Sequence, residues 1–178
     1  MRQTQDSDRQ VLETERLRLR ELTLDDAAFI LTLLNEPAFI RFIGDKGVRT
    51  LADARNYLQK GPIASYDRFG YGLWLAQLKL SGEPLGVCGL VRRDTLPDAD
   101  IGYAYLERYW SKGYATEAAR GVMRHAFDVL GLKRLLAITD QENSGSIKVL
   151  KKIGLKDEGL VRLSDEGPEL ILFGLNEG

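Results

Sequence analysis

The stretch that decides the fold is residues 101–118, which read IGYAYLERYWSKGYATEA. A strand is expected over residues 99–106, a short loop follows, and a long helix is expected from about residue 112 to 130. Gly131 is suited to end that helix, because glycine readily adopts the left-handed conformation found after a helix C-terminus. The core of the prediction is therefore one strand that leads through a tight turn into one helix.

The turn has the chemistry of a phosphate-binding site. The first turn of a helix has backbone N–H groups without helical partners, and its dipole favours an anion. Gly113 has no side chain that would hold a phosphate away, and Lys112 adds a positive charge. Neither Gly-x4-Gly-Lys-Ser/Thr nor Gly-x-Gly-x-x-Gly is present. A purely structural turn, with glycine for close packing, accounts for the spacing equally well.

The elements on either side of this unit predict a mixed sheet. Residues 16–20 alternate Arg and Leu, which is typical of a half-buried strand. A helix is expected over residues 27–34, interrupted by Pro37, and a second from Thr50 to Gln59, ended by Gly61-Pro62. The remaining elements are an antiparallel hairpin of residues 71–80 and 85–92, a strand at 133–139, a helix at 144–153, and final strands near 160 and at 169–175. This order predicts an α+β fold with helices over the faces of the sheet.

Composition excludes several classes of protein. The chain has 178 residues, so one domain is expected, over residues 13–178. Its formal net charge of −1 argues against an electrostatic nucleic-acid binder and leaves a local basic patch open. One cysteine cannot form an internal disulfide or a cysteine zinc site, and the single histidine removes most histidine-based metal chemistry. No apolar run is long enough for a membrane span, and residues 1–12 are expected to be a polar leader. A cytoplasmic location is therefore expected.

Two motifs resemble those of a known family. Residues 109–118, YWSKGYATEA, resemble the acyl-CoA loop Gln/Arg-x-x-Gly-x-Gly/Ala of the GNAT N-acetyltransferases, with Trp110 at the Gln/Arg position. Residues 143–155, NSGSIKVLKKIGL, resemble the helix Asn-x-x-Ser-x-x-Val-Leu-x-x-x-Gly-Phe of the branch that acetylates ribosomal-protein N-termini. Further similarity in residues 13–20, 72–74 and 85–90 extends the resemblance over nearly the whole chain.

The resemblance implies a fold and a cofactor. The fold would be a twisted mixed sheet of about seven strands with about four helices, splayed between the strand at 101–106 and that at 134–139. Acetyl-CoA would lie in the split as co-substrate, and no metal would be needed. The residues implied to hold it are Tyr103, Ala104 and Tyr105 at the pantetheine arm, Lys112, Gly113, Tyr114, Ala115 and Thr116 at the pyrophosphate, and Asn143 and Ser146 on the other side. Lys152 is a candidate for the 3′-phosphate, although a solvated helix face is an alternative for it.

The chemistry implied is direct acetyl transfer to an amine in a ternary complex. The amine must lose a proton, so a base is needed, and Asp100 is the candidate. The oxyanion would be stabilised by a backbone N–H of residues 103–105. Ser146 would protonate the leaving thiolate, because Leu150 stands where many relatives carry a tyrosine. Asp165 and Glu166 are rival acids, and solvated surface roles are alternatives for all three carboxylates.

The acceptor is the least determined part of the prediction. Phe39 and Phe42, in an apolar patch outside any expected element, and Trp74 are candidates for lining its site, with core packing as the alternative for each. His125 is expected to be a packing or surface residue, and Cys88 a core residue. The expected acceptor is a peptide or protein N-terminal amine, and acidic groups in the groove would instead favour a cationic small amine. A small-molecule acetyltransferase, a non-catalytic acyl-CoA sensor and a homodimer all stay open.

Overall fold

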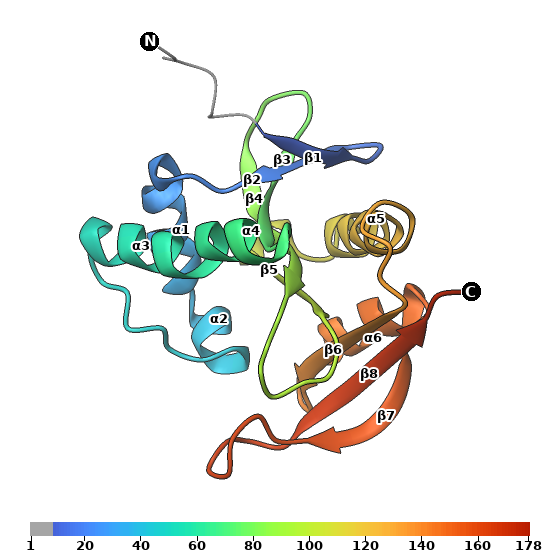
Figure 1. The fold of residues 1–178 in the computed structure, drawn as a ribbon. Coiled ribbons are helices and arrows are strands. Elements are labelled where there is room, and N and C mark those ends of the chain that lie inside the picture. Colours follow the sequence, from blue (N-terminus) through green and yellow to red (C-terminus); the bar gives the residue numbers. More distant parts are fainter. Residues whose placement is uncertain (1–8) are drawn as a thin grey trace.

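One eight-stranded sheet forms the frame of the protein, in a computed structural model that describes residues 9–178 (Figure 1). Its order is β1-β2-β3-β4-β5-β6-β8-β7, and all neighbours are antiparallel except β5 and β6. The strands are β1 (Gln10–Glu13), β2 (Leu17–Glu21), β3 (Leu73–Leu78), β4 (Pro84–Val91), β5 (Asp100–Tyr105), β6 (Arg134–Asp140), β7 (Lys156–Val161) and β8 (Leu170–Asn176). The predicted α+β class and mixed sheet are confirmed, with eight strands in place of about seven.

The additional strand lies where a leader was predicted. β1 pairs antiparallel with β2, with Leu12 opposite Leu19, and Val11 and Leu12 pack against the core beneath α5 (Tyr114–Asp128). The predicted leader is therefore wrong for residues 10–12, because this apolar pair is covered by α5. Residues 1–8 of that predicted segment lie outside the described residues.

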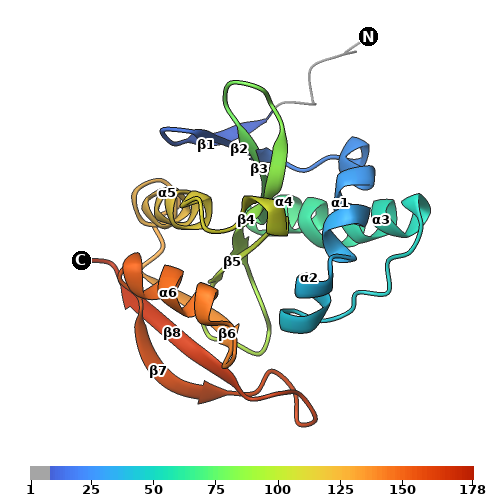
Figure 2. The same ribbon diagram turned by 180° about the vertical axis from the view of Figure 1, so that it is seen from behind.

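Helices cover both faces of the sheet. Figures 1 and 2 show α1 (Ala27–Leu34), α2 (Pro37–Phe42), α3 (Leu51–Leu58) and α4 (Ala64–Phe69) on one side, and α5 and α6 (Ser144–Lys152) on the other. Each face buries its own apolar cluster. Ile30 and Leu58 pack with Leu75 of the sheet on the first side, and Ala118 and Val122 of α5 pack with Trp74 on the second. None of the helices described here is long and apolar enough to cross a membrane.

Two prolines act differently from the prediction. Pro37 does not simply interrupt a helix but occupies the first turn of α2, where its missing N–H costs no hydrogen bond. The apolar patch of residues 39–43 is thus largely helical. Gly61-Pro62 does not end α3, because a wide π-helical turn at Gln59–Ile63 accommodates Pro62 and leads directly into α4. Residues of α2, of the π-helical turn and of α4 line the same cavity as residues 100–104 of β5.

The sheet splits in its middle. β5 is paired with β4 along its whole length, yet it meets β6 at one residue pair, Asp100 opposite Leu136. Beyond this pair the strands diverge, as Figure 2 shows, and the rest of that edge of β5 has no strand partner among the described residues. An unpaired strand edge in the interior of a sheet offers backbone N–H and C=O groups to a ligand.

Candidate active site

The turn before α5 depends on a glycine. Gly113 has a φ of +82° at the N-cap of α5, in the left-handed region that glycine favours. A Cβ built there would lie 3.3 Å from Arg16 Nη2. Arg16 in turn holds the turn, since its Nη1 donates to the Lys112 carbonyl at 3.0 Å and its Nε to Glu117 Oε2 at 2.7 Å.

Glu117 fixes α5 against the first two strands. Its Oε1 accepts hydrogen bonds from Thr14 Oγ1 at 2.6 Å and from the Arg16 backbone N–H at 2.7 Å. Burial would raise the pKa of Glu117, but the hydrogen bonds from Thr14 and Arg16 outweigh it and hold that pKa below its usual value. Glu117 is therefore an ionised structural anchor beside the turn.

A basic cavity of about 640 Å³ opens beside this turn. Its basic residues are Arg16, Arg120, Arg124 and Lys152, and Thr14, Glu15, Gly113, Thr116 and Glu117 complete the lining. Lys152 lies at the end of α6 and lines this cavity. Its backbone carbonyl accepts a hydrogen bond from Arg120 Nη2 at 3.3 Å. A helix N-terminus, a glycine and an excess of cations together suit a phosphate-bearing ligand.

The structure groups the predicted loop residues only in part. Gly113, Thr116 and Lys152 line the basic cavity, whereas Lys112, Tyr114 and Ala115 do not. The Lys112 ammonium lies 5.7 Å from the centre of the Tyr109 ring, and the Tyr114 ring lies under Arg16 at 4.4 Å. Ala115 packs toward the core. Sequence reasoning missed Arg120 and Arg124, although their spacing of four from Thr116 indicates one face of a helix.

Trp110 has a role the sequence did not reveal. Its indole Nε1 donates to the Tyr105 carbonyl at 2.9 Å, so it ties the loop to the end of β5. The Tyr105 ring is buried in the cluster beneath α5. The residue at the Gln/Arg position of the loop motif therefore fastens the turn to the strand.

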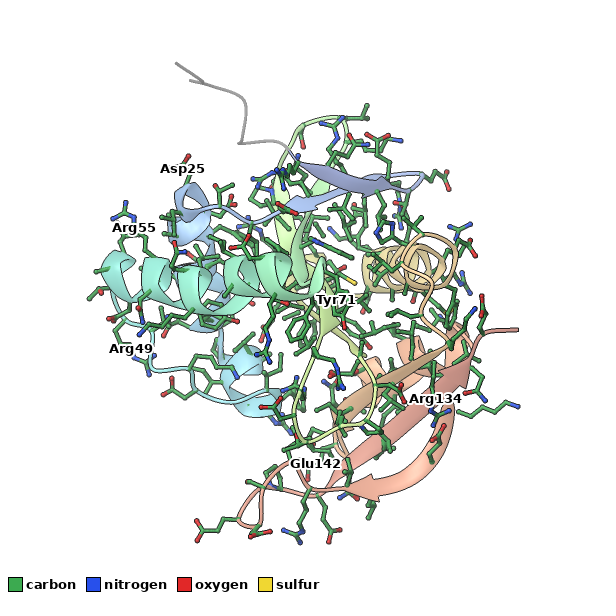
Figure 3. The ribbon with its side chains drawn as sticks, in the orientation of Figure 1. Asp25, Arg49, Arg55, Tyr71, Arg134 and Glu142 are labelled. Atoms are coloured by element: carbon green, nitrogen blue, oxygen red, sulfur yellow. The ribbon has the colours of Figure 1, made fainter. Side chains whose placement is uncertain are left out.

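A second, larger cavity of about 850 Å³ lies over the split between β5 and β6. Residues 100–104 of β5, residues 138–140 of β6, and Asn143, Ser146 and Leu150 of the α6 region contribute to it. The rest of the lining comes from α1, α2, the segment from α3 to α4, β4, and the loop between β7 and β8, among others. At its mouth, Arg41 pairs with Glu142 at 3.5 Å, and Figure 3 shows Glu142 beside the split.

Hydroxyl groups meet at the inner edge of this cavity. Asn143 caps α6, because its Oδ1 accepts the Ser146 backbone N–H at 3.1 Å. Tyr103 Oη lies 2.9 Å from Ser146 Oγ and also donates to the Ser146 carbonyl at 3.2 Å. Burial raises the pKa of Tyr103 above its usual value, and the hydrogen bond with Ser146 opposes this only in part. The phenol therefore stays protonated at neutral pH.

Asp100 is a buried carboxylate in the same cavity. Its side chain is 1% exposed, and Oδ1 accepts from Arg93 Nε at 3.1 Å. Burial raises the pKa of Asp100 to about 6, and the neighbouring Arg93 offsets only part of that rise. A carboxyl group with this pKa changes protonation close to neutral pH. The alternative of a solvated strand-end carboxylate is wrong, because Asp100 is covered.

Only some of the residues predicted to line the acceptor site do line the larger cavity. Phe39, Phe42 and Ala104 line the larger cavity, but Trp74 does not. Trp74 is 2% exposed on the opposite face, edge-on to His125 at 5.5 Å. The expectation that Trp74 lines the acceptor site is thus wrong, because alternation along β3 turns Leu73 to the cavity in its place.

The remaining predicted residues lie outside the site. Asp165 and Glu166 are exposed at the tip of the β7–β8 loop and are not part of the lining, although Ser164 and Gly167 are. Cys88 is fully buried, and burial raises the pKa of its thiol to about 12. Cys88 belongs to the core cluster beneath α5, and the half-buried His125 of α5 packs against Trp74, so both are packing residues.

Comparison with known proteins agrees with this geometry. Residues 16–156 match the model of the acetyltransferase (GNAT) domain. The uncharacterized N-acetyltransferase p20 of Bacillus licheniformis is 30% identical over 154 residues, covering 86% of each chain. The spermidine N(1)-acetyltransferase of Escherichia coli K12 is 26% identical, covering 80% of this chain and 74% of its own.

The fold is also shared with solved structures. The ribosomal-protein-S5-alanine acetyltransferase of Vibrio fischeri superposes with a TM-score of 0.76 at 18% identity, covering 93% of this chain and 95% of its own. The splayed sheet, the glycine turn at the start of α5 and the match over most of the sequence point to one conclusion. This chain belongs to the GNAT family and is an N-acetyltransferase that uses acetyl-CoA.

Proposed function

We propose that this enzyme transfers the acetyl group of acetyl-CoA directly to the α-amine of a peptide or protein N-terminus. One observation carries the proposal. A carboxylate with a pKa of about 6, Asp100, and a hydroxyl pair, Tyr103 and Ser146, line one cavity over the unpaired edge of β5. The same cavity therefore contains a candidate base, Asp100, and candidate acids, Tyr103 and Ser146, for an acyl transfer.

Acetyl-CoA fits the two cavities together. The turn at Gly113 and the basic cavity beside it suit the pyrophosphate and the 3′-phosphate, with Thr116 and Lys152 among the contacts. The unpaired edge of β5 at residues 103–105 suits the amides of the pantetheine arm, with Asn143 on the opposite side. The thioester then lies near Ser146 in the split.

Asp100 acts as the base. An α-amine has a reference pKa of about 8 and must be neutral to attack the thioester carbon. At neutral pH Asp100 is mostly ionised and accepts the proton that the amine releases, directly or through water. The C–N bond forms as the proton leaves the nitrogen. The oxyanion is stabilised by a backbone N–H on the edge of β5.

Ser146 completes the transfer. When the C–S bond breaks, the thiolate of coenzyme A takes a proton from Ser146 Oγ, and the Tyr103 phenol replaces it through the 2.9 Å hydrogen bond. Tyr103 recovers its proton from solvent as the products leave. No covalent enzyme intermediate forms. The two hydroxyls thus replace the helix tyrosine whose position Leu150 occupies.

A polyamine is the second candidate acceptor, favoured by the similarity to the spermidine enzyme. The charge of the larger cavity speaks against a polyamine, because most of the charged residues in its lining are basic. Calorimetric titration with acetyl-CoA, followed by thiol release with N-terminal peptides, polyamines and aminoglycosides, tests the proposal. Turnover on peptides supports it. Turnover on polyamines alone would overturn the acceptor, and binding without turnover would favour a sensor.

A further inference from the structure

The larger cavity concentrates positive charge. Six basic residues and two acidic residues line it, in a chain whose formal net charge is −1. The basic residues are Arg41, Lys46, Lys60, Arg68, Arg92 and Arg93, and the acidic ones are Asp100 and Asp140. The cavity that faces the proposed base is therefore unsuited to a ligand with several positive charges.

Some of this charge is already used by the protein. Arg92 donates to the carbonyls of Leu96 at 2.7 Å and Pro97 at 3.2 Å, which fixes the segment between β4 and β5. Arg41 is paired with Glu142 at the exposed mouth. Asp140 accepts the backbone N–H of Glu142. These groups have structural partners, and the other basic residues of the lining remain to be explained.

Lys46, which is exposed, and Arg93, which is half-buried, bring more positive charge to the cavity beside Asp100 than this one carboxylate offsets. Lys46 forms no hydrogen bond or ion pair with any described residue, and burial together with the nearby Arg93 lowers the pKa of its ammonium. Arg93 also faces the Tyr57 hydroxyl and counteracts the rise that burial causes in the pKa of Tyr57. Lys46, Tyr57 and Arg93 thus converge beside Asp100, with one carboxylate for two cations.

Two further basic residues of the larger cavity, Lys60 and Arg68, also have no acidic partner among the described residues. Lys60 lies on the π-turn and Arg68 on α4, and the Arg68 guanidinium lies over the Phe69 ring at 4.9 Å. Both residues are exposed to solvent and are available to pair with an anionic group of a bound ligand.

From this arrangement we infer that the acceptor carries a carboxylate or phosphate a few bonds from its amine, and that Lys46 and Arg93 bind this anion while the amine faces Asp100. The inference rests on the proposed acetyl transfer and specifies its substrate class. Both a free amino acid and a peptide with acidic residues after its first position supply this chemistry. Arg93 remains paired with Asp100 through Nε and has other guanidinium N–H groups for the ligand.

The test uses acceptor pairs that differ only in charge. One pair is the C-terminally amidated peptides Ala-Glu-Glu-Ala and Ala-Gln-Gln-Ala, another is alanine and alaninamide, and spermidine is the cationic acceptor. Binding to the coenzyme A complex of the enzyme is measured by calorimetry, and kcat and KM by thiol release. The first pair tests whether the acceptor is an acidic peptide, and the second tests whether it is a free amino acid.

Lys46→Gln should raise KM for the preferred anionic acceptor about tenfold, as the loss of one charge-assisted contact predicts. The KM for the uncharged counterpart, the kcat and the affinity for acetyl-CoA should stay unchanged. Lys148→Gln is the matched control, because Lys148 is an exposed lysine of α6 outside both cavities.

Tighter binding of the anionic member of either pair, lost in Lys46→Gln and kept in Lys148→Gln, supports the inference. Equal or weaker binding of both anionic members, or a preference for spermidine, overturns it. The binding measurement does not require turnover. An enzyme that binds anionic acceptors without acetylating them would therefore refute the proposed transfer and leave the anion site in place.

Discussion

Tyr103 Oη lies 2.9 Å from Ser146 Oγ and joins β5 to α6 across the split in the sheet. Ser146 is oriented from its other side, because its backbone N–H is bound by Asn143 Oδ1. Tyr103 is half-buried, and burial keeps its phenol protonated. A hydroxyl on a helix is thereby supplied with a proton by a residue on the neighbouring strand.

Ser146→Ala should lower kcat about 10- to 100-fold, because the thiolate loses its proton donor, while the Kd for acetyl-CoA changes little. Tyr103→Phe should give a smaller loss of kcat, since solvent can reprotonate Ser146 slowly. Steady-state kinetics and calorimetry on the same samples check this. Ser144→Ala, in the first turn of the same helix, is the control. An unchanged kcat in Ser146→Ala would remove Ser146 from the mechanism.

The pH dependence should report Asp100. Because burial raises the pKa of Asp100 to about 6, the base is protonated and inactive below this pH and ionised above it. The contribution of this group to kcat/KM should therefore rise tenfold per pH unit below about 6 and level off above it, on top of the rise up to about pH 8 that the neutral fraction of an α-amine acceptor gives. Asp100→Asn should lower the rate and abolish that inflection. An inflection that persists in Asp100→Asn would assign the base to another group.

Gly113→Asp should abolish acetyl-CoA binding. The substitution places a carboxylate at the N-terminus of α5, opposite the pyrophosphate, and forces an L side chain into a φ of +82° next to Arg16. Gly131→Asp is the matched control, because Gly131 has a φ of +68° with nothing near its Cβ position. Calorimetric titration measures the affinity for acetyl-CoA, and thermal unfolding checks that each variant is folded. Retained binding in a folded Gly113→Asp protein would contradict the assignment of the loop.

How much could be predicted depends on where each residue's partners lie. The turn at Gly113 and the helix after it follow from local pattern, since capping and helical periodicity act within a few residues. β1 was missed because its short apolar pair, Val11 and Leu12, becomes meaningful only under α5. Trp74 was misplaced because β3 is buried on both faces, so alternation does not show which face meets the cavity.

The arrangement of charged residues in the site could not be predicted from local sequence pattern for a similar reason. Lys46 and Arg93 lie far apart in the sequence and come together only when the loop after α2 and the segment after β4 are placed beside each other. The same holds for Arg16, which reaches the α5 turn from the start of β2. The protonation of Asp100 likewise depends on burial, which the sequence does not specify.

Lys152 gives the sharpest test of how the cofactor lies. If the 3′-phosphate of coenzyme A occupies the basic cavity with Lys152 and Arg124, Lys152→Gln should weaken the binding of coenzyme A about tenfold. It should leave the binding of dephospho-coenzyme A, which lacks this phosphate, unchanged. The ratio of the two Kd values removes any general effect of the substitution on the fold. Lys151→Gln, at an exposed lysine outside the cavity, should leave the ratio as in the unaltered enzyme. Equal weakening of both ligands by Lys152→Gln would place Lys152 at the pyrophosphate, and no weakening would leave it on the solvated face of α6.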